Sequence, residues 1–172
     1  MASFRIEHTF NCSEKTFWDQ VFFDNEYNQR QFAEALKFSL WKELSREDRG
    51  ADIYRVVQAA PPIGDLPGPL KAVIGDSAGY EERGTFLKAK NQYTAKVVPN
   101  KLADKITVEV KMWTEAKGDN SCLRVAEASV TAKIFGVGGM LEKKMLADME
   151  KSYVKSAAFT NQWLAEKNLT GK

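Results

Sequence analysis

Residues 136–167 read GVGGMLEKKMLADMEKSYVKSAAFTNQWLAEK and form the longest periodic segment of the chain. Small or apolar side chains recur there at steps of three or four residues: Leu141, Met145, Met149, Ser152, Ser156, Phe159 and Trp163. This spacing matches the period of an α-helix and predicts one buried face along a single helix. At ~1.5 Å per residue the helix would be roughly 40–45 Å long, so it needs a broad surface to pack against.

The chain before this helix is dominated by strand-like alternation of apolar and polar residues. Ser13 is positioned as the N-cap of a short helix, and a second helical piece follows over residues 28–36. We interpret residues 45–50 as a charged turn. The expected strands cover residues 4–10, 37–44, 53–58, 79–89, 92–98, 103–114 and 123–134. Short turns between them predict a mostly antiparallel sheet.

Four of the five prolines lie in one segment, at Pro61, Pro62, Pro67 and Pro69. This density excludes a regular helix or strand, although residues 70–74 could add one helical turn. A long loop of this kind in a compact domain is more often a lid or a binding loop than an ordinary connection.

The last expected strand has small side chains on one face, at Ala126, Ala128, Val130, Ala132 and Ile134. Two interpretations are open. The alanines could let the long helix pack close to the sheet, or they could leave a hollow beneath it.

Composition places the chain among ordinary globular proteins and favours a single domain, residues 1–172. Twenty-five Lys and Arg against 23 Asp and Glu leave a net charge of +2, with the signs interleaved. Nucleic-acid binding through charge is therefore not expected. The sequence has no apolar run typical of a signal peptide or membrane span, which favours the cytoplasm. In that compartment Cys12 and Cys122 are expected as reduced thiols.

The expected order is a strand, two short helices, a run of antiparallel strands and a long C-terminal helix. This order resembles the START-like superfamily, also called helix-grip or SRPBCC, which includes birch-pollen allergens, polyketide cyclases and lipid-transfer domains. Three sequence motifs carry a closer resemblance. The motifs are FRIEHTF at residues 4–10, LPG at residues 66–68 and GVGGMLEK at residues 136–143. They are similar to a bacterial START-like family of unknown function, and residues 135–163 also resemble the end of sterol-binding VASt domains. The resemblance implies an α+β helix-grip fold: a curved antiparallel sheet wrapped around the long C-terminal helix, with two short helices after the first strand.

An apolar cavity between sheet and helix is also implied. Our candidates for its wall and mouth combine adaptable methionines with apolar side chains and a few hydroxyls. They are Tyr54, Leu66, Leu70, Ile74, Val108, Met112, Ala128, Met145, Met149, Tyr153 and Ser156. We expect a binding or transfer protein for a hydrophobic small molecule, lipid-like or sterol-like, with at most transient membrane contact. The sequence leaves the oligomeric state open.

No catalytic residue, metal site or cofactor is predicted. His8 is the only histidine and shares a strand face with Phe4, Ile6 and Phe10, which favours a structural role. One histidine with two isolated cysteines gives no zinc set, and no nucleophile motif is present. Two other functions remain: a cyclase-like enzyme using His8, Tyr54 or Tyr153 as acid or base, and a protein-interaction domain without a small-molecule ligand.

Overall fold

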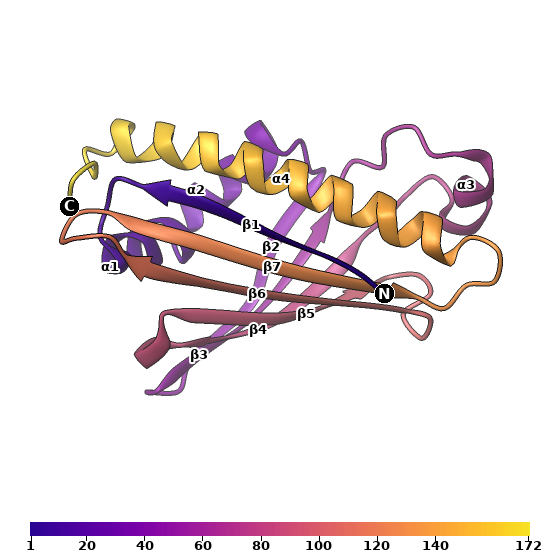
Figure 1. Ribbon diagram of the computed structural model, residues 1–172, viewed down its shortest axis with the longest axis horizontal. Helices are drawn as coiled ribbons and strands as arrows, with labels where there is room; N and C mark the ends of the chain where they lie inside the picture. The colour runs from indigo at the N-terminus through magenta and orange to yellow at the C-terminus, as the bar shows by residue number, and fades with distance from the viewer.

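The structure, a computed structural model that describes residues 1–172, contains one seven-stranded antiparallel sheet that curves under a long helix (Figure 1). The strand order is β1-β7-β6-β5-β4-β3-β2, so β2 to β7 form a meander and β1 pairs with β7. The bounds are β1 Ala2–Phe10, β2 Leu40–Asp48, β3 Asp52–Ala60, β4 Tyr80–Leu87, β5 Gln92–Pro99, β6 Ile106–Ala116 and β7 Cys122–Ala132. The predicted helix-grip fold is confirmed.

The long helix, α4, spans Gly138–Glu166 and crosses one face of the sheet (Figure 1). Ser13 caps the first short helix, because its side chain accepts a hydrogen bond from the Thr16 backbone N–H at 3.2 Å. None of the helices has the length and apolar character that a membrane-spanning helix requires. The other helical segments are α1 Glu14–Phe17, η1 Trp18–Phe22, α2 Asn25–Arg30, η2 Gln31–Ala35, α3 Gly68–Ile74 and η3 Lys88–Lys90.

The second strand differs from its prediction. It was expected over residues 37–44 with a charged turn at 45–50, but β2 continues to Asp48 and only residues 49–51 form the turn. β2 is an edge strand, where charged side chains stay in water and also discourage pairing with another sheet. Its charges pair locally: Arg46 lies 2.7 Å from Glu43, and Lys88 lies 2.7 Å from Asp48.

The two larger clusters of buried residues lie at the two ends of α4, and a third, of Trp41, Val57 and Ala59, lies on β2 and β3. At its C-terminal end, Phe10, Trp18 and Trp163 belong to a large aromatic cluster beneath the short helices. At its N-terminal end, Leu141 and Leu146 pack in a second cluster of aliphatic residues from β6, β7 and α3. Both of these clusters include residues of α4 and of the sheet, which holds the helix on one face.

The alanines of β7 allow α4 to approach the sheet closely. Ala126, Ala128 and Ala132 are buried, and α4 packs on β7 and β1. A Cβ atom on Gly138 would lie 2.2 Å from the Ala132 carbonyl oxygen, so only glycine fits this contact. Of the two interpretations of the small-residue face, close packing describes these alanines.

Candidate functional site

A cavity of about 550 Å³ lies beside this contact, between α4 and the inner face of the sheet. Twenty-five of its 44 lining residues are hydrophobic. Its volume falls within the range of roughly 300–1,000 Å³ that is usual for small-molecule sites. The strands contribute Trp41, Arg55, Val57, Tyr80, Glu82, Tyr93, Val97, Pro99, Ile106, Val108, Val110, Met112 and Arg124.

Eight of the eleven predicted wall and mouth residues line this cavity: Leu66, Ile74, Val108, Met112, Met145, Met149, Tyr153 and Ser156. The proline-rich segment also borders it through Pro61 and Pro62. Alternate residues of β6 point to the same face of the sheet, and residues three or four apart on α4 share one face of the helix. The two faces meet at the cavity. Contact of these residues with a ligand stays a prediction.

The remaining three predicted residues lie elsewhere. Tyr54 is on the opposite face of β3 from Arg55, and the Arg49 guanidinium lies 4.7 Å from its ring centre. Leu70 is fully buried in the aliphatic cluster, which it shares with residues of β6, β7 and α4. Ala128 lies in the same cluster, at the close contact between β7 and α4. None of the three is a lining residue.

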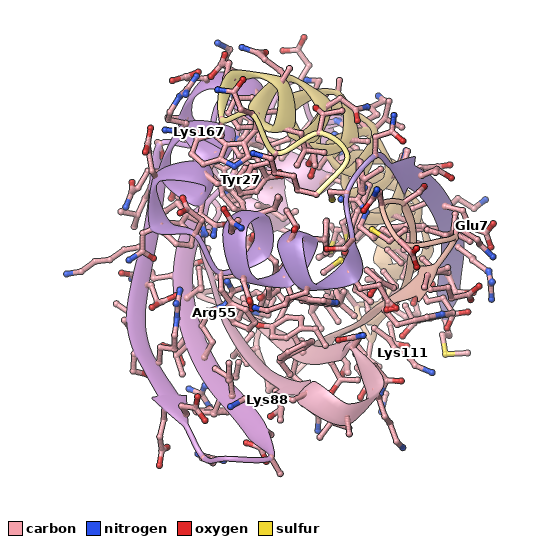
Figure 2. The ribbon with its side chains drawn as sticks, turned by 90° about the vertical axis from the view of Figure 1, so that its left-hand side faces the viewer. Glu7, Tyr27, Arg55, Lys88, Lys111 and Lys167 are labelled. Atoms are coloured by element: carbon pink, nitrogen blue, oxygen red, sulfur yellow. The ribbon has the colours of Figure 1, made fainter.

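Arg55 forms the first polar group of the cavity, where it lies between the sheet and the short helices (Figure 2). Its side chain is only 5% exposed and lies 3.5 Å from the Glu82 carboxylate. The Tyr93 hydroxyl donates to the same carboxylate at 2.7 Å. Burial disfavours the charged guanidinium, but Tyr93 and Glu82 outweigh it and raise the Arg55 pKa. This arginine therefore has its counter-charge within the protein.

Arg124 is the second buried arginine that lines the cavity, and its guanidinium has only neutral neighbours. Its Nη2 lies 3.0 Å from Nδ1 of His8 and donates to the Tyr153 carbonyl at 3.2 Å, while Nη1 donates to the Ser156 hydroxyl at 3.4 Å. The aromatic ring centres of Phe10 and Tyr153 lie 5.1 and 5.2 Å from its Cζ. Burial lowers the pKa of Arg124.

A chain of hydrogen bonds continues from Ser156 to the short helices. The Ser156 hydroxyl donates to the Gln31 side-chain oxygen at 2.5 Å, and the Tyr27 hydroxyl donates to the same oxygen at 2.6 Å. Tyr27 also lies 2.7 Å from the Thr160 hydroxyl. Figure 2 shows Tyr27 next to the C-terminal end of α4. This network fixes the polar end of the cavity, because each hydroxyl is held from two sides.

The tyrosines at the cavity remain protonated at neutral pH. Burial raises the pKa of Tyr153 to about 12, and it also raises those of Tyr80 and Tyr93. Burial, and then the nearby charge of Arg124, lowers the pKa of His8. Tyr93 therefore stays a hydrogen-bond donor to Glu82, and His8 is held neutral as an acceptor for Arg124.

The sequence prediction missed Gln31, Arg55, Glu82, Tyr93 and Arg124. A signal existed for Arg124, which is in phase with the inward alanines of β7. A charged residue in phase with a buried face is uncommon and indicates a partner or a function. The alternation of β3 gave no such signal for Arg55, because apolar residues occupy both faces of this strand.

Comparison with known proteins adds family information. A profile described as "Protein of unknown function (DUF2505)" matches residues 5–164. No curated protein matches the chain by sequence.

Solved structures show the same fold at low sequence identity. The crystal structure of TTHA0849 from Thermus thermophilus has a TM-score of 0.64 and 14% identity, covering 96% of this chain and 99% of that chain. The Zhui aromatase/cyclase from Streptomyces sp. R1128 has a TM-score of 0.62 and 13% identity, covering 96% and 93%. A START superfamily protein from Mycobacterium smegmatis has a TM-score of 0.55 and 15% identity, covering 88% and 93%.

These likenesses confirm the START-like fold, while the similarity to VASt domains stays a prediction. Because the profile spans nearly the whole chain, this protein belongs to the DUF2505 family of proteins of unknown function.

Proposed function

We propose that this protein binds a hydrophobic small molecule, lipid-like or sterol-like, in the cavity under α4, and stores or transfers it. The observation that carries the proposal is the cavity of about 550 Å³ with a mostly hydrophobic lining. Three methionines, Met112, Met145 and Met149, line it from β6 and α4. Their unbranched side chains adapt to ligands of different shape.

The size of the cavity supports an occupied state. If the slope of ~24 cal/mol per Å³ held for a dry void of about 550 Å³, the cost would be about 13 kcal/mol. That is comparable with the whole stability of a typical domain. We therefore expect the space to hold water or a ligand, and the hydrophobic lining favours a ligand.

Other chains with this fold carry small organic molecules. A norcoclaurine synthase from Thalictrum flavum is described in complex with dopamine and hydroxybenzaldehyde, and shares the fold at a TM-score of 0.55 and 12% identity. At such identity the likeness concerns the fold alone. It supports a ligand cavity without identifying the ligand.

Native mass spectrometry with organic extraction of the purified protein tests the proposal. We expect a discrete small molecule bound to the wild type. Met149→Trp, which fills the cavity from α4, should remove it. The neighbouring Glu150→Trp lies on the exposed face of α4 and should retain it. An empty wild type that also fails to bind an uncharged apolar fluorophore, 4-(1-pyrenyl)butanol, would refute the proposal.

A cyclase-like enzyme is a second candidate, favoured by one observation. The cavity wall holds a carboxylate, Glu82, hydrogen-bonded to the Tyr93 hydroxyl at 2.7 Å. Such a pair supplies a base and a proton donor next to a bound molecule. Conversion of the extracted molecule by the wild type but not by Glu82→Gln would favour catalysis over storage or transfer.

A further inference from the structure

Arg124 is a buried positive charge without a counter-charge. The residue is 3% exposed, and its three hydrogen bonds go to His8, Ser156 and a backbone carbonyl. Its Nε atom is buried and has no hydrogen-bond partner, which is also true of Arg55, so the missing counter-charge is what sets Arg124 apart. A guanidinium has five N–H donors, so the protein leaves donor capacity unused at the cavity wall.

Arg55 shows how this chain otherwise handles a buried arginine. Both arginines are buried and line the same cavity, but Arg55 lies 3.5 Å from Glu82. A buried charge without a partner costs several kcal/mol, and an arginine does not escape this cost by losing its proton. The protein places no carboxylate next to Arg124. A bound molecule with a carboxylate could supply the missing negative charge.

The charges around the cavity have the same sign as Arg124. Six basic residues line it, against the two acids Glu82 and Asp148. Of the four lysines, Lys151 and Lys155 are exposed on α4, whereas Lys144 pairs with Asp148. The excess of four positive charges at the cavity exceeds the net charge of +2 for the whole chain. Such a concentration of one sign attracts anions to the opening.

We propose that Arg124 binds the carboxylate of an amphipathic ligand, whose apolar part lies among the methionines and valines of the cavity. This inference rests on the proposed function and narrows its ligand class to hydrophobic carboxylic acids. The Ser156 hydroxyl, already hydrogen-bonded to Arg124, lies beside the carboxylate. The lysines on α4 draw the acid to the opening, and Arg124 holds it inside.

A purely architectural role for Arg124 makes a different prediction. The arginine also joins β1, β7 and α4 through His8, Ser156 and Tyr153. If it served only to join these elements, the cavity would bind acids and uncharged molecules equally. A difference in affinity between an acid and the corresponding alcohol therefore distinguishes a ligand-binding role of Arg124 from a purely architectural one. This difference can be measured on the wild-type protein alone.

The experiment compares 4-(1-pyrenyl)butyric acid with 4-(1-pyrenyl)butanol, by fluorescence titration at pH 7.5. We expect the wild type to bind the acid roughly 10- to 100-fold more tightly, because hydrogen bonds to charged groups are worth ~1.5–3 kcal/mol. Arg124→Met should abolish this preference while binding the alcohol as before. Arg124→Lys should keep part of it. Lys143→Met, which removes an exposed charge of α4 that does not line the cavity, should change either affinity by less than about threefold.

Circular dichroism and a thermal melt establish that each variant is folded before titration. Equal affinity of the wild type for both probes would overturn the inference and leave the proposed function standing. A preference that survives in folded Arg124→Met would also overturn it. Failure of both probes to bind a wild type that native mass spectrometry shows to be empty would overturn the inference and the proposed function together.

Discussion

Gly84 leaves the space that the Tyr93 hydroxyl occupies. A Cβ atom on Gly84 would lie 1.9 Å from that oxygen, whose hydrogen bond goes to Glu82 beside Arg55. Neighbouring strands place the two residues together, because Gly84 of β4 and Tyr93 of β5 are on the same inner face. The hydrogen bond from Tyr93 to Glu82 therefore requires that residue 84 has no side chain.

We predict that Gly84→Ala lowers the free energy of unfolding by about 1–3 kcal/mol, because Tyr93 must move and give up its buried hydrogen bond to Glu82. Urea unfolding measures this change. Gly68→Ala is the control, since a Cβ atom there meets nothing within 4 Å. Equal stability of the two variants would show that Tyr93 relocates without cost.

His8 should make stability depend on pH. Arg124 donates to its Nδ1, which requires the tautomer with the proton on Nε2. Burial and then Arg124 lower the His8 pKa, below the value of ~6.5 expected in the unfolded chain. The unfolded state therefore binds the proton more readily. The contribution is present above pH ~6.5 and is lost as the pH falls through the lowered pKa.

His8→Gln removes this titration and keeps an acceptor for Arg124. We predict that wild-type stability declines more steeply than that of His8→Gln as the pH falls from 7 towards 5, measured by urea unfolding. Comparison with the variant cancels the carboxylates that both proteins share. Parallel pH profiles would contradict the lowered pKa.

At the scale of elements, the start of α4 depends on one of two adjacent glycines. Gly138 faces the Ala132 carbonyl, and the Glu142 side chain accepts a hydrogen bond from the Ala132 N–H at 2.8 Å. The first turn of the helix is thereby fixed to the end of β7. Gly139 has open space around it.

We predict that Gly138→Ala lowers the free energy of unfolding by about 1–3 kcal/mol, because the added methyl pushes α4 away from β7. Gly139→Ala should be neutral or more stable by up to ~1 kcal/mol, because alanine is the better helix former. Thermal melts of the two variants provide a matched comparison. Similar melting temperatures would mean that the close contact is not required.

Elements with sustained periodicity could be predicted from the sequence. α4 was found within two residues at each end, because its pattern repeats over eight turns. The end of β2 was missed, because Arg46 and Asp48 sit on a solvated edge strand whose charges resemble those of a turn. In β3, apolar Tyr54 and Val56 on one face and Val57 on the other left the inward side undetermined.

At the scale of the molecule, the apolar wall was largely predictable and the polar groups were not. Met145 and Met149 follow from the period of one helix, but the neighbours of Arg124 come from strands and a helix far apart in sequence. Pairing of buried polar groups depends on the register of β1 against β7, where His8 is opposite Arg124. A local sequence pattern indicates which residues of a strand share a face, but it does not indicate which residue of the neighbouring strand lies opposite.

The cavity makes any molecule that fills it part of the folded core. A ligand that binds only the folded state adds about 2.7 kcal/mol of stability at a hundred times its dissociation constant, a gain that vanishes when the ligand runs out. Chains left empty open more often, and quality-control proteases remove the open form. The abundance of such a protein would then follow the supply of its ligand, so the hollow beneath α4 would set the protein's lifetime in the cell as well as its binding capacity.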